Sequence, residues 1–114
     1  MKLYSIEHFW ADIVADTATV GVTAYVIKML GGVKFISPPN PGDTVAAGHS
    51  AGAFETKKLA MEIISPVSGE VIEIQNLPEL TTAEPEGNGW LFKVRLTAEP
   101  SALMTGEEYA EQVR

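Results

Sequence analysis

The residues best suited to chemistry in this 114-residue chain are two adjacent lysines, Lys57 and Lys58, in the middle of segment 54–62. The segment lies between two runs that read as strands, and its centre is mostly polar. This pattern predicts a β-hairpin that holds the lysines at its tip in solvent. A lysine at such a tip has no packing role, so its amine is either a covalent attachment point or an ordinary solvated charge.

The rest of the chain offers few other reactive groups. It contains no cysteine, which excludes disulfides, thiolate metal sites and cysteine nucleophiles. Its two histidines, His8 and His49, are far apart in sequence and belong to no metal-binding motif. We expect His8 to be a structural polar group or a polar group on the side of the lysine tip, and His49 to be a surface residue. Redox or group-transfer chemistry would therefore need a group attached to the protein.

Composition narrows the class of protein and its partners. A chain of this length is expected to form one domain, residues 1–114. Its net charge of −7, with 15 acidic and 8 basic residues, argues against nucleic acid or an anionic membrane surface as a partner. No run approaches the roughly 20 apolar residues of a membrane span, and no signal-peptide core follows Met1. These features predict a cytoplasmic protein, which we expect to be a monomer.

Short strands separated by turn residues dominate the predicted secondary structure. Strands are expected at residues 9–14, 18–22, 33–36, 50–55, 60–64, 71–75 and 90–96. A helix is expected at 24–30, capped by Thr23, and helical structure is expected again from Pro100, with a capping box at Thr105. Segment 43–48 is expected to be a turn-like connector, and segment 76–89 a long structureless connection.

This order of elements predicts a mainly β fold, a small β-sandwich or flattened barrel with short peripheral helices and a C-terminal helix. Two proline-glycine turns, at 41–45 and 66–71, lie on either side of the lysine hairpin and would place it at one end of the sandwich. Aromatic residues expected in the core are Trp10, Phe35, Trp90 and Phe92. Glycines expected at positive φ or at close backbone approaches are Gly42, Gly48 and Gly69.

Several segments resemble the H protein of the glycine cleavage system, within the wider lipoyl- and biotinyl-carrier fold. Residues 18–23 (Ala-Thr-Val-Gly-Val-Thr) match that family's Ala-Thr-Val-Gly-Ile-Thr, and 65–71 (Ser-Pro-Val-Ser-Gly-Glu-Val) match its Ala-Pro-Val-Ser-Gly-Glu-Val. Looser matches are 8–10 (His-Phe-Trp for His-Glu-Trp), 30–33 (Leu-Gly-Gly-Val for Leu-Gly-Asp-Val) and 87–93 (Gly-Asn-Gly-Trp-Leu-Phe-Lys for Gly-x-Gly-Trp-Leu-x-Lys). Together they cover most of the chain and imply a carrier of the barrel-sandwich hybrid type.

The resemblance implies a role for the lysine tip. Residues 55–59 (Glu-Thr-Lys-Lys-Leu) occupy the place of the family's lipoylation motif, Glu-Ser-Val-Lys-Ala, so the lipoyl attachment site should be Lys58. Glu55 is expected either to orient the hairpin for a lipoate ligase or lipoyl transferase, or only to keep the tip soluble. Biotin carriers place methionine on both sides of the lysine, whereas Lys57 and Leu59 flank it here. Lipoate is therefore favoured over biotin. A further hypothesis is that the protein is an interaction module whose lysine is not modified.

The resemblance also implies partners. Lipoate on Lys58 would carry an aminomethyl group and reducing equivalents between glycine decarboxylase, aminomethyltransferase and dihydrolipoamide dehydrogenase, so the chain would be a carrier and not an enzyme. Some residues depart from the family pattern, with Phe9 for glutamate, Lys57 for valine, Leu59 for alanine and Glu86 for tyrosine. These departures leave open an alternative, in which an H-like lipoate-binding protein carries sulfur intermediates for a heterodisulfide-reductase-like complex in sulfur oxidation.

Overall fold

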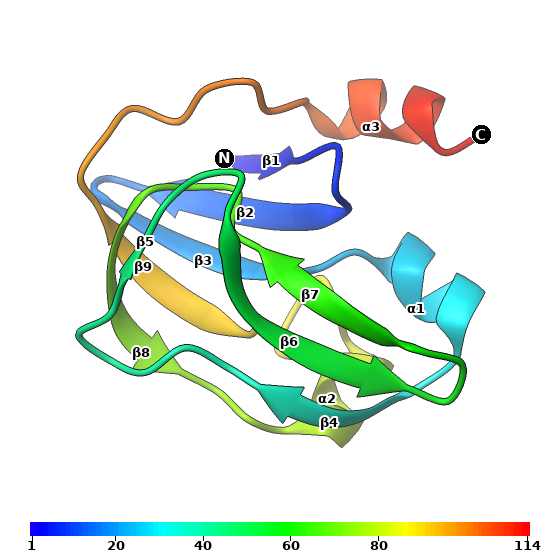
Figure 1. Ribbon diagram of the computed structural model, residues 1–114. Coiled ribbons are helices and arrows are strands. Elements are labelled where there is room, and N and C mark those ends of the chain that lie inside the picture. The colour runs from blue at the N-terminus through cyan, green and yellow to red at the C-terminus, as the bar shows by residue number, and fades with distance from the viewer.

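The computed structural model describes all 114 residues and arranges nine strands and three helices in two sheets (Figure 1). The elements are β1 (Lys2–Tyr4), β2 (Phe9–Val14), β3 (Thr17–Val22), α1 (Ala24–Leu30), β4 (Val33–Ser37), β5 (Thr44–Val45), β6 (Ser50–Thr56), β7 (Ala60–Ile64), β8 (Gly69–Ile74), α2 (Pro78–Ala83), β9 (Phe92–Leu96) and α3 (Gly106–Gln112). The larger sheet has the order β1-β2-β3-β9-β8-β5 and the smaller one β4-β6-β7, with antiparallel pairing throughout. The predicted mainly β fold with peripheral helices is confirmed.

The hydrophobic core lies between the two sheets, because alternate side chains of each strand point to the same face. Phe9 of β2 and Phe54 of β6 link the sheets, with ring centroids 6.4 Å apart and nearly perpendicular planes. Both are buried, and burying a side chain of this kind contributes about 1.5–3 kcal/mol to folding. Phe9 is therefore a core residue, although it stands where the H-protein pattern has a glutamate.

The glycines expected at special backbone positions are found there. Gly42 and Gly48 have φ values of 94° and 83°, which L side chains rarely adopt. Gly69 begins β8, where a Cβ atom would collide with the carbonyl oxygen of Arg95 on β9. These turns bring the chain into and out of the hairpin that carries the lysines.

Two loop and helix predictions are wrong. Segment 76–89 contains helix α2, because Pro78 suits the first helical turn and the hydroxyl of Thr82 accepts a 2.8 Å hydrogen bond from Val33 N on β4. The helix expected from Pro100 onward does not form before Thr105. Instead, Met104 forms a β-bridge with Tyr4, with N–O distances of 2.7 and 2.8 Å.

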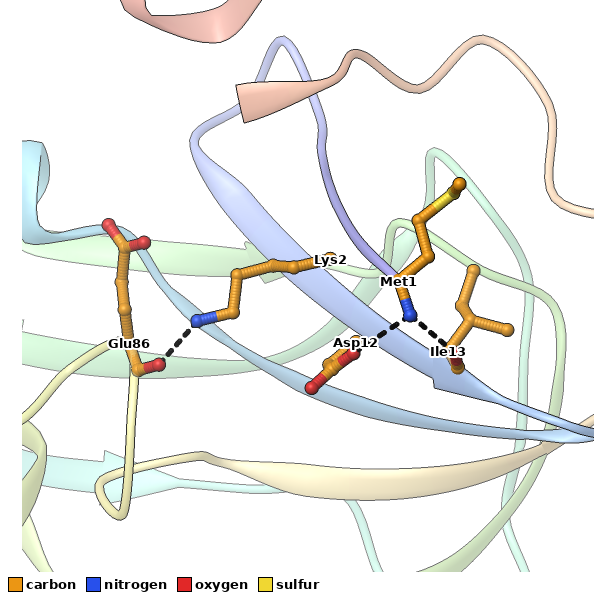
Figure 2. Close-up of polar contacts among 5 residues, drawn as sticks. All are labelled: Met1, Lys2, Asp12, Ile13 and Glu86. Carbon is orange, nitrogen blue, oxygen red and sulfur yellow. Dashed lines mark hydrogen bonds and ion pairs between the residues drawn. The ribbon is translucent and has the colours of Figure 1, made fainter. Parts of the chain in front are cut away.

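The structure also contains two short strands that the sequence analysis did not predict. Segment 43–48 was expected to be only a connector, but it contains β5, which pairs with the start of β8. No strand was predicted before Phe9, but residues Lys2–Tyr4 form β1. Two hydrogen bonds from the amino group of Met1 fix β1 to β2, one to Asp12 Oδ1 (3.3 Å) and one to Ile13 O (2.8 Å), as Figure 2 shows.

The predicted capping box of α3 is present at Thr105 and Glu108. It positions Tyr109, whose ring stacks on Tyr4 of β1 with a centroid distance of 4.8 Å. The hydroxyl of Tyr109 shares 2.8 Å hydrogen bonds with His8 Nδ1 and with Thr23 Oγ1. His8 is therefore a structural polar group that ties α3 to the larger sheet, and burial raises the pKa of the Tyr109 hydroxyl.

The N-terminus of α1 is capped by a residue distant in sequence. Thr23 is the N-cap residue, as predicted, but its side chain makes no capping hydrogen bond. The carboxylate of Glu86 accepts the hydrogen bond from Ala24 N instead (2.8 Å), and it also accepts one from the hydroxyl of Tyr4 (2.7 Å). Burial, followed by this hydrogen bond with Glu86, raises the pKa of Tyr4. Lys2 Nζ donates to the backbone carbonyl of Glu86 (Figure 2), which anchors the loop between α2 and β9 to β1.

None of the three helices is long and apolar enough to cross a lipid bilayer.

Candidate functional site

The two lysines lie at the tip of a β-hairpin, as predicted. Strands β6 and β7 pair up to Glu55 and Ala60, and residues 57–59 connect them. Figure 1 shows this hairpin extending to one end of the molecule, where its tip lies beside α1 and the start of β4. The side chains of Lys57, Lys58 and Leu59 are exposed.

Thr56 fixes the conformation of the tip. Its side chain is 7% exposed, and its hydroxyl accepts hydrogen bonds from the amides of Lys58 (3.2 Å) and Leu59 (3.1 Å). The same hydroxyl donates to Leu59 O at 2.9 Å, and Thr56 N donates to that carbonyl at 2.9 Å. The amides of Lys58 and Leu59 and the carbonyl of Leu59 are thus paired within the tip. Sequence reasoning assigned no role to Thr56, although a threonine just before a turn is a known local hydrogen-bonding arrangement.

The amine of Lys58 makes one hydrogen bond, from Nζ to the carbonyl oxygen of Met29 at 2.8 Å. Met29 is in the last turn of α1, where carbonyl groups lack helical partners and attract positive charge. The side chain of Lys58 is exposed and has no packing role, as predicted, but its amine contacts the fold through this hydrogen bond. The contact is exposed to solvent, so an enzyme can reach the amine after one hydrogen bond is broken.

Lys57 points to a different part of the surface. Its side chain lies beside Gly31 and, with Gly32, Lys34 and Glu79, lines a hollow between the start of β4 and α2. The two neighbouring amines are therefore not equivalent. Lys58 lies over the end of α1, and Lys57 lies along the wall of this hollow.

Glu55 is exposed on the outer face of the smaller sheet, where it pairs in register with Phe35 on one side and Ala60 on the other. It forms no ion pair, so its carboxylate is free to meet a partner. Phe35 was predicted to be a core residue and is instead 65% exposed. The register shifts between Val33 and Phe35, and such an irregularity redirects the side chains that follow it.

Other candidate centres are not formed. Trp90 was expected in the core but is half-buried, and Lys93 Nζ lies over its ring, 4.9 Å from the ring centroid. His49 is exposed, as expected. No cluster of three or more histidine, aspartate or glutamate side chains could hold a metal ion. The exposed lysines at the hairpin tip therefore remain the candidate reactive groups.

Comparison with known proteins identifies the family. A family model described as "Glycine cleavage H-protein" matches residues 2–114. The chain belongs to the glycine cleavage H-protein family. Such a protein is a lipoyl-carrying component of a multienzyme system and is not itself a catalyst, so the resemblance seen in the sequence is confirmed.

Individual relatives agree along nearly the full length. The chain is 44% identical over 112 residues to the glycine cleavage system H protein of Thermobifida fusca, which covers 95% of this chain and 89% of that protein. It is 44% identical over 117 residues to the one from Marinobacter nauticus, covering 96% and 90%. The crystal structure of a glycine cleavage system H protein from Mycobacterium marinum superposes with a TM-score of 0.89 at 34% identity, covering 97% of this chain and 94% of that one.

The role of Thr56 can be tested by Thr56→Val, which keeps the shape of the side chain and removes its hydroxyl. We expect amide hydrogen exchange of Lys58 and Leu59 to become roughly tenfold faster or more, because unpaired donors at a buried hydroxyl site cost about 1–3 kcal/mol. Thr17→Val, at the start of β3, is the matched control, since the Thr17 hydroxyl makes only an exposed 3.3 Å contact with Asp16. Unchanged exchange at Lys58 and Leu59 in Thr56→Val would show that the tip is held by other means.

Proposed function

We propose that this protein carries lipoate in amide linkage to Nζ of Lys58. The observation that carries the proposal is an exposed lysine amine on a hydrogen-bonded hairpin tip, three residues after Glu55, in a chain that the H-protein family model matches from residue 2 to 114. The chain has no cysteine, so both sulfur atoms of a redox-active arm would be supplied by the attached group.

The residues around Lys58 support attachment in separate ways. Thr56 keeps the tip in one conformation, so the amine meets a ligase or transferase without a cost for ordering the turn. The carbonyl of Met29 holds the ammonium form until the enzyme displaces it and the amine loses a proton. The amine then attacks the carboxyl carbon of the lipoyl adenylate that the ligase makes from lipoate and ATP; the amide bond forms as the bond to AMP breaks, and the positive charge of the lysine is lost. Glu55, free of any partner on the adjacent outer face, is the residue we propose the ligase recognises.

Once attached, lipoate supplies a disulfide that can be opened to a dithiol. The protein holds the attachment point at one end of a stable sandwich, and partner enzymes approach from the solvent side of the tip. Tethering raises the effective concentration of the carried group at each partner's active site. We propose glycine decarboxylase, aminomethyltransferase and dihydrolipoamide dehydrogenase as those partners, with an aminomethyl group and reducing equivalents as the cargo.

The attachment site is tested by incubating the protein with lipoate, ATP and a lipoate ligase and measuring the intact mass. We expect one added lipoyl group on the wild type and on Lys57→Arg, and none on Lys58→Arg, since arginine keeps the charge but is not acylated. Lys57→Arg is the matched control for loss of one tip lysine. Addition to Lys58→Arg, or its loss in Lys57→Arg, would place the attachment elsewhere.

A second candidate function is transport of sulfur intermediates for a heterodisulfide-reductase-like complex. The observation that favours it is the burial of Phe9 against Phe54, since the H-protein pattern has a carboxylate at position 9 and this chain has none there. Lipoate on Lys58 would be needed in either pathway. The two functions differ in their partners and not in the attachment.

The partner set is tested with fully lipoylated protein and glycine decarboxylase, by following exchange of labelled bicarbonate into the carboxyl group of glycine. We expect exchange above the level that Lys58→Arg supports, because the arm accepts the aminomethyl group. Lipoylated protein that gives no more exchange than Lys58→Arg would contradict the glycine cleavage role and favour the sulfur carrier.

A further inference from the structure

Positive charge is concentrated at the end of the molecule that carries the hairpin tip. Segments 24–34 and 56–59 form this end, where α1, the start of β4 and the tip lie side by side (Figure 1). These two segments contain four of the eight basic residues and none of the fifteen acidic ones, although the whole chain has a net charge of −7. A small part of a strongly acidic protein therefore carries only positive charge.

The basic residues at this end differ from the others in having no ionic partner. Elsewhere, three basic side chains pair with glutamates, and the fourth, Lys2, donates to a backbone carbonyl and lies over the ring of Trp10. The four at the tip end are all exposed and form no ion pair; they are Lys28, Lys34, Lys57 and Lys58. Their charge is available to a binding partner.

Contacts place these lysines on one surface with the attachment amine. Lys58 Nζ bonds the carbonyl oxygen of Met29, which directly follows Lys28. Lys34 and Lys57 line the same hollow at the start of β4. An enzyme that reaches the amine of Lys58 must therefore come close to three further positive charges.

Two apolar side chains on the same surface adjoin Lys58. Met29 is 49% exposed and accepts the hydrogen bond from Lys58, and Leu59, the next residue in the chain, is 48% exposed. Protein interfaces combine apolar contacts with a polar, solvent-accessible rim. We call this surface the tip face; its residues are Lys28, Met29, Lys34, Lys57, Lys58 and Leu59.

Two carboxylates border the tip face without pairing with it. Glu79 lines the same hollow as Lys34 and Lys57 but forms no ion pair with either. Glu55 is exposed on the outer face of the smaller sheet. The charge of the tip face is therefore not cancelled by an ion pair within the protein.

We propose that the tip face docks against an acidic surface of the lipoate ligase that modifies Lys58, an inference that rests on the proposed function. Complementary charges steer two proteins into encounter and speed their association. The unmodified protein carries all four charges, and acylation removes that of Lys58, so the ligase is attracted more strongly to its substrate than to its product. Nucleic acid and anionic membranes fit this face less well, because the fifteen acidic residues elsewhere would repel them.

The test measures kcat/KM for lipoylation by the ligase from the same cells, at about 0.02 M and about 0.5 M salt, where screening is weak and strong. The variant Lys34→Gln/Lys57→Gln removes two charges from the tip face. Its matched control, Arg95→Gln/Arg114→Gln, removes two exposed charges elsewhere and has the same net charge. A third variant, Lys34→Arg/Lys57→Arg, keeps the charges and changes the side chains. Amide spectra of each protein check that the fold is intact.

At low salt we expect kcat/KM to fall about fivefold in Lys34→Gln/Lys57→Gln and less than about twofold in the control, because only the first loses charges that face the ligase. At high salt we expect the two variants and the wild type to agree, since the attraction is screened. We expect Lys34→Arg/Lys57→Arg to retain the wild-type value at both salt concentrations.

Three results would overturn the acidic docking surface alone. They are wild-type lipoylation that does not slow with salt, equal rates for Lys34→Gln/Lys57→Gln and its control at low salt, and a loss in Lys34→Arg/Lys57→Arg as large as that in the glutamine variant. A wild type that acquires no lipoyl group on Lys58 at either salt concentration would overturn the proposed function, and this inference with it.

Discussion

The structure depends on one constraint at the hairpin tip. A three-residue turn must find hydrogen-bond partners for its backbone amides and still leave a lysine amine exposed to solvent. The hydroxyl of Thr56 meets this constraint by bonding the amides of Lys58 and Leu59 and the carbonyl of Leu59. The alternation of β6 supports it, because Phe54 and Thr56 point inward while Glu55 points outward. The inward side of the hairpin is therefore buried up to Thr56, and the carboxylate of Glu55 remains exposed.

The surroundings of the tip give its two lysines different positions. Lys58 rests on the end of α1 and can leave it by breaking one hydrogen bond, whereas Lys57 lines the hollow between the start of β4 and α2. The position of α1 depends in turn on Glu86, which caps its first turn and bonds Tyr4. Glu86, at which this chain departs from the family pattern, thus helps to position the helix on which Lys58 rests.

The parts of the fold that follow from local rules were predictable from the sequence. The strands flanking the tip, the turn glycines and the capping box of α3 follow from alternation, backbone freedom and side-chain spacing within a few residues. The position of Lys58 on a hairpin tip followed from the same rules. Its assignment to lipoate came from resemblance to a family, because no local rule distinguishes an attachment lysine from a solvated one.

The features that were missed depend on contacts between distant segments. Phe35 is exposed because the register of β4 against β6 shifts beside it, and the capping of α1 comes from a residue 62 positions away from Ala24. Residues 101–104 include good helix formers, but Met104 pairs with Tyr4 in a β-bridge and Ala102 has a φ of 58°, so no helix forms there. The role of Thr56 could have been predicted from the sequence, since its hydrogen bonds reach only to residues up to three positions further along the chain.

The central claim is that the amine of Lys58 is the point at which this protein acquires its chemistry. The most direct test is peptide mapping by mass spectrometry of the protein isolated from the cells that make it. The account predicts that the peptide containing Lys58 bears one lipoyl group and that no other lysine does. An unmodified Lys58, in cells whose other lipoyl proteins are fully modified, would contradict it.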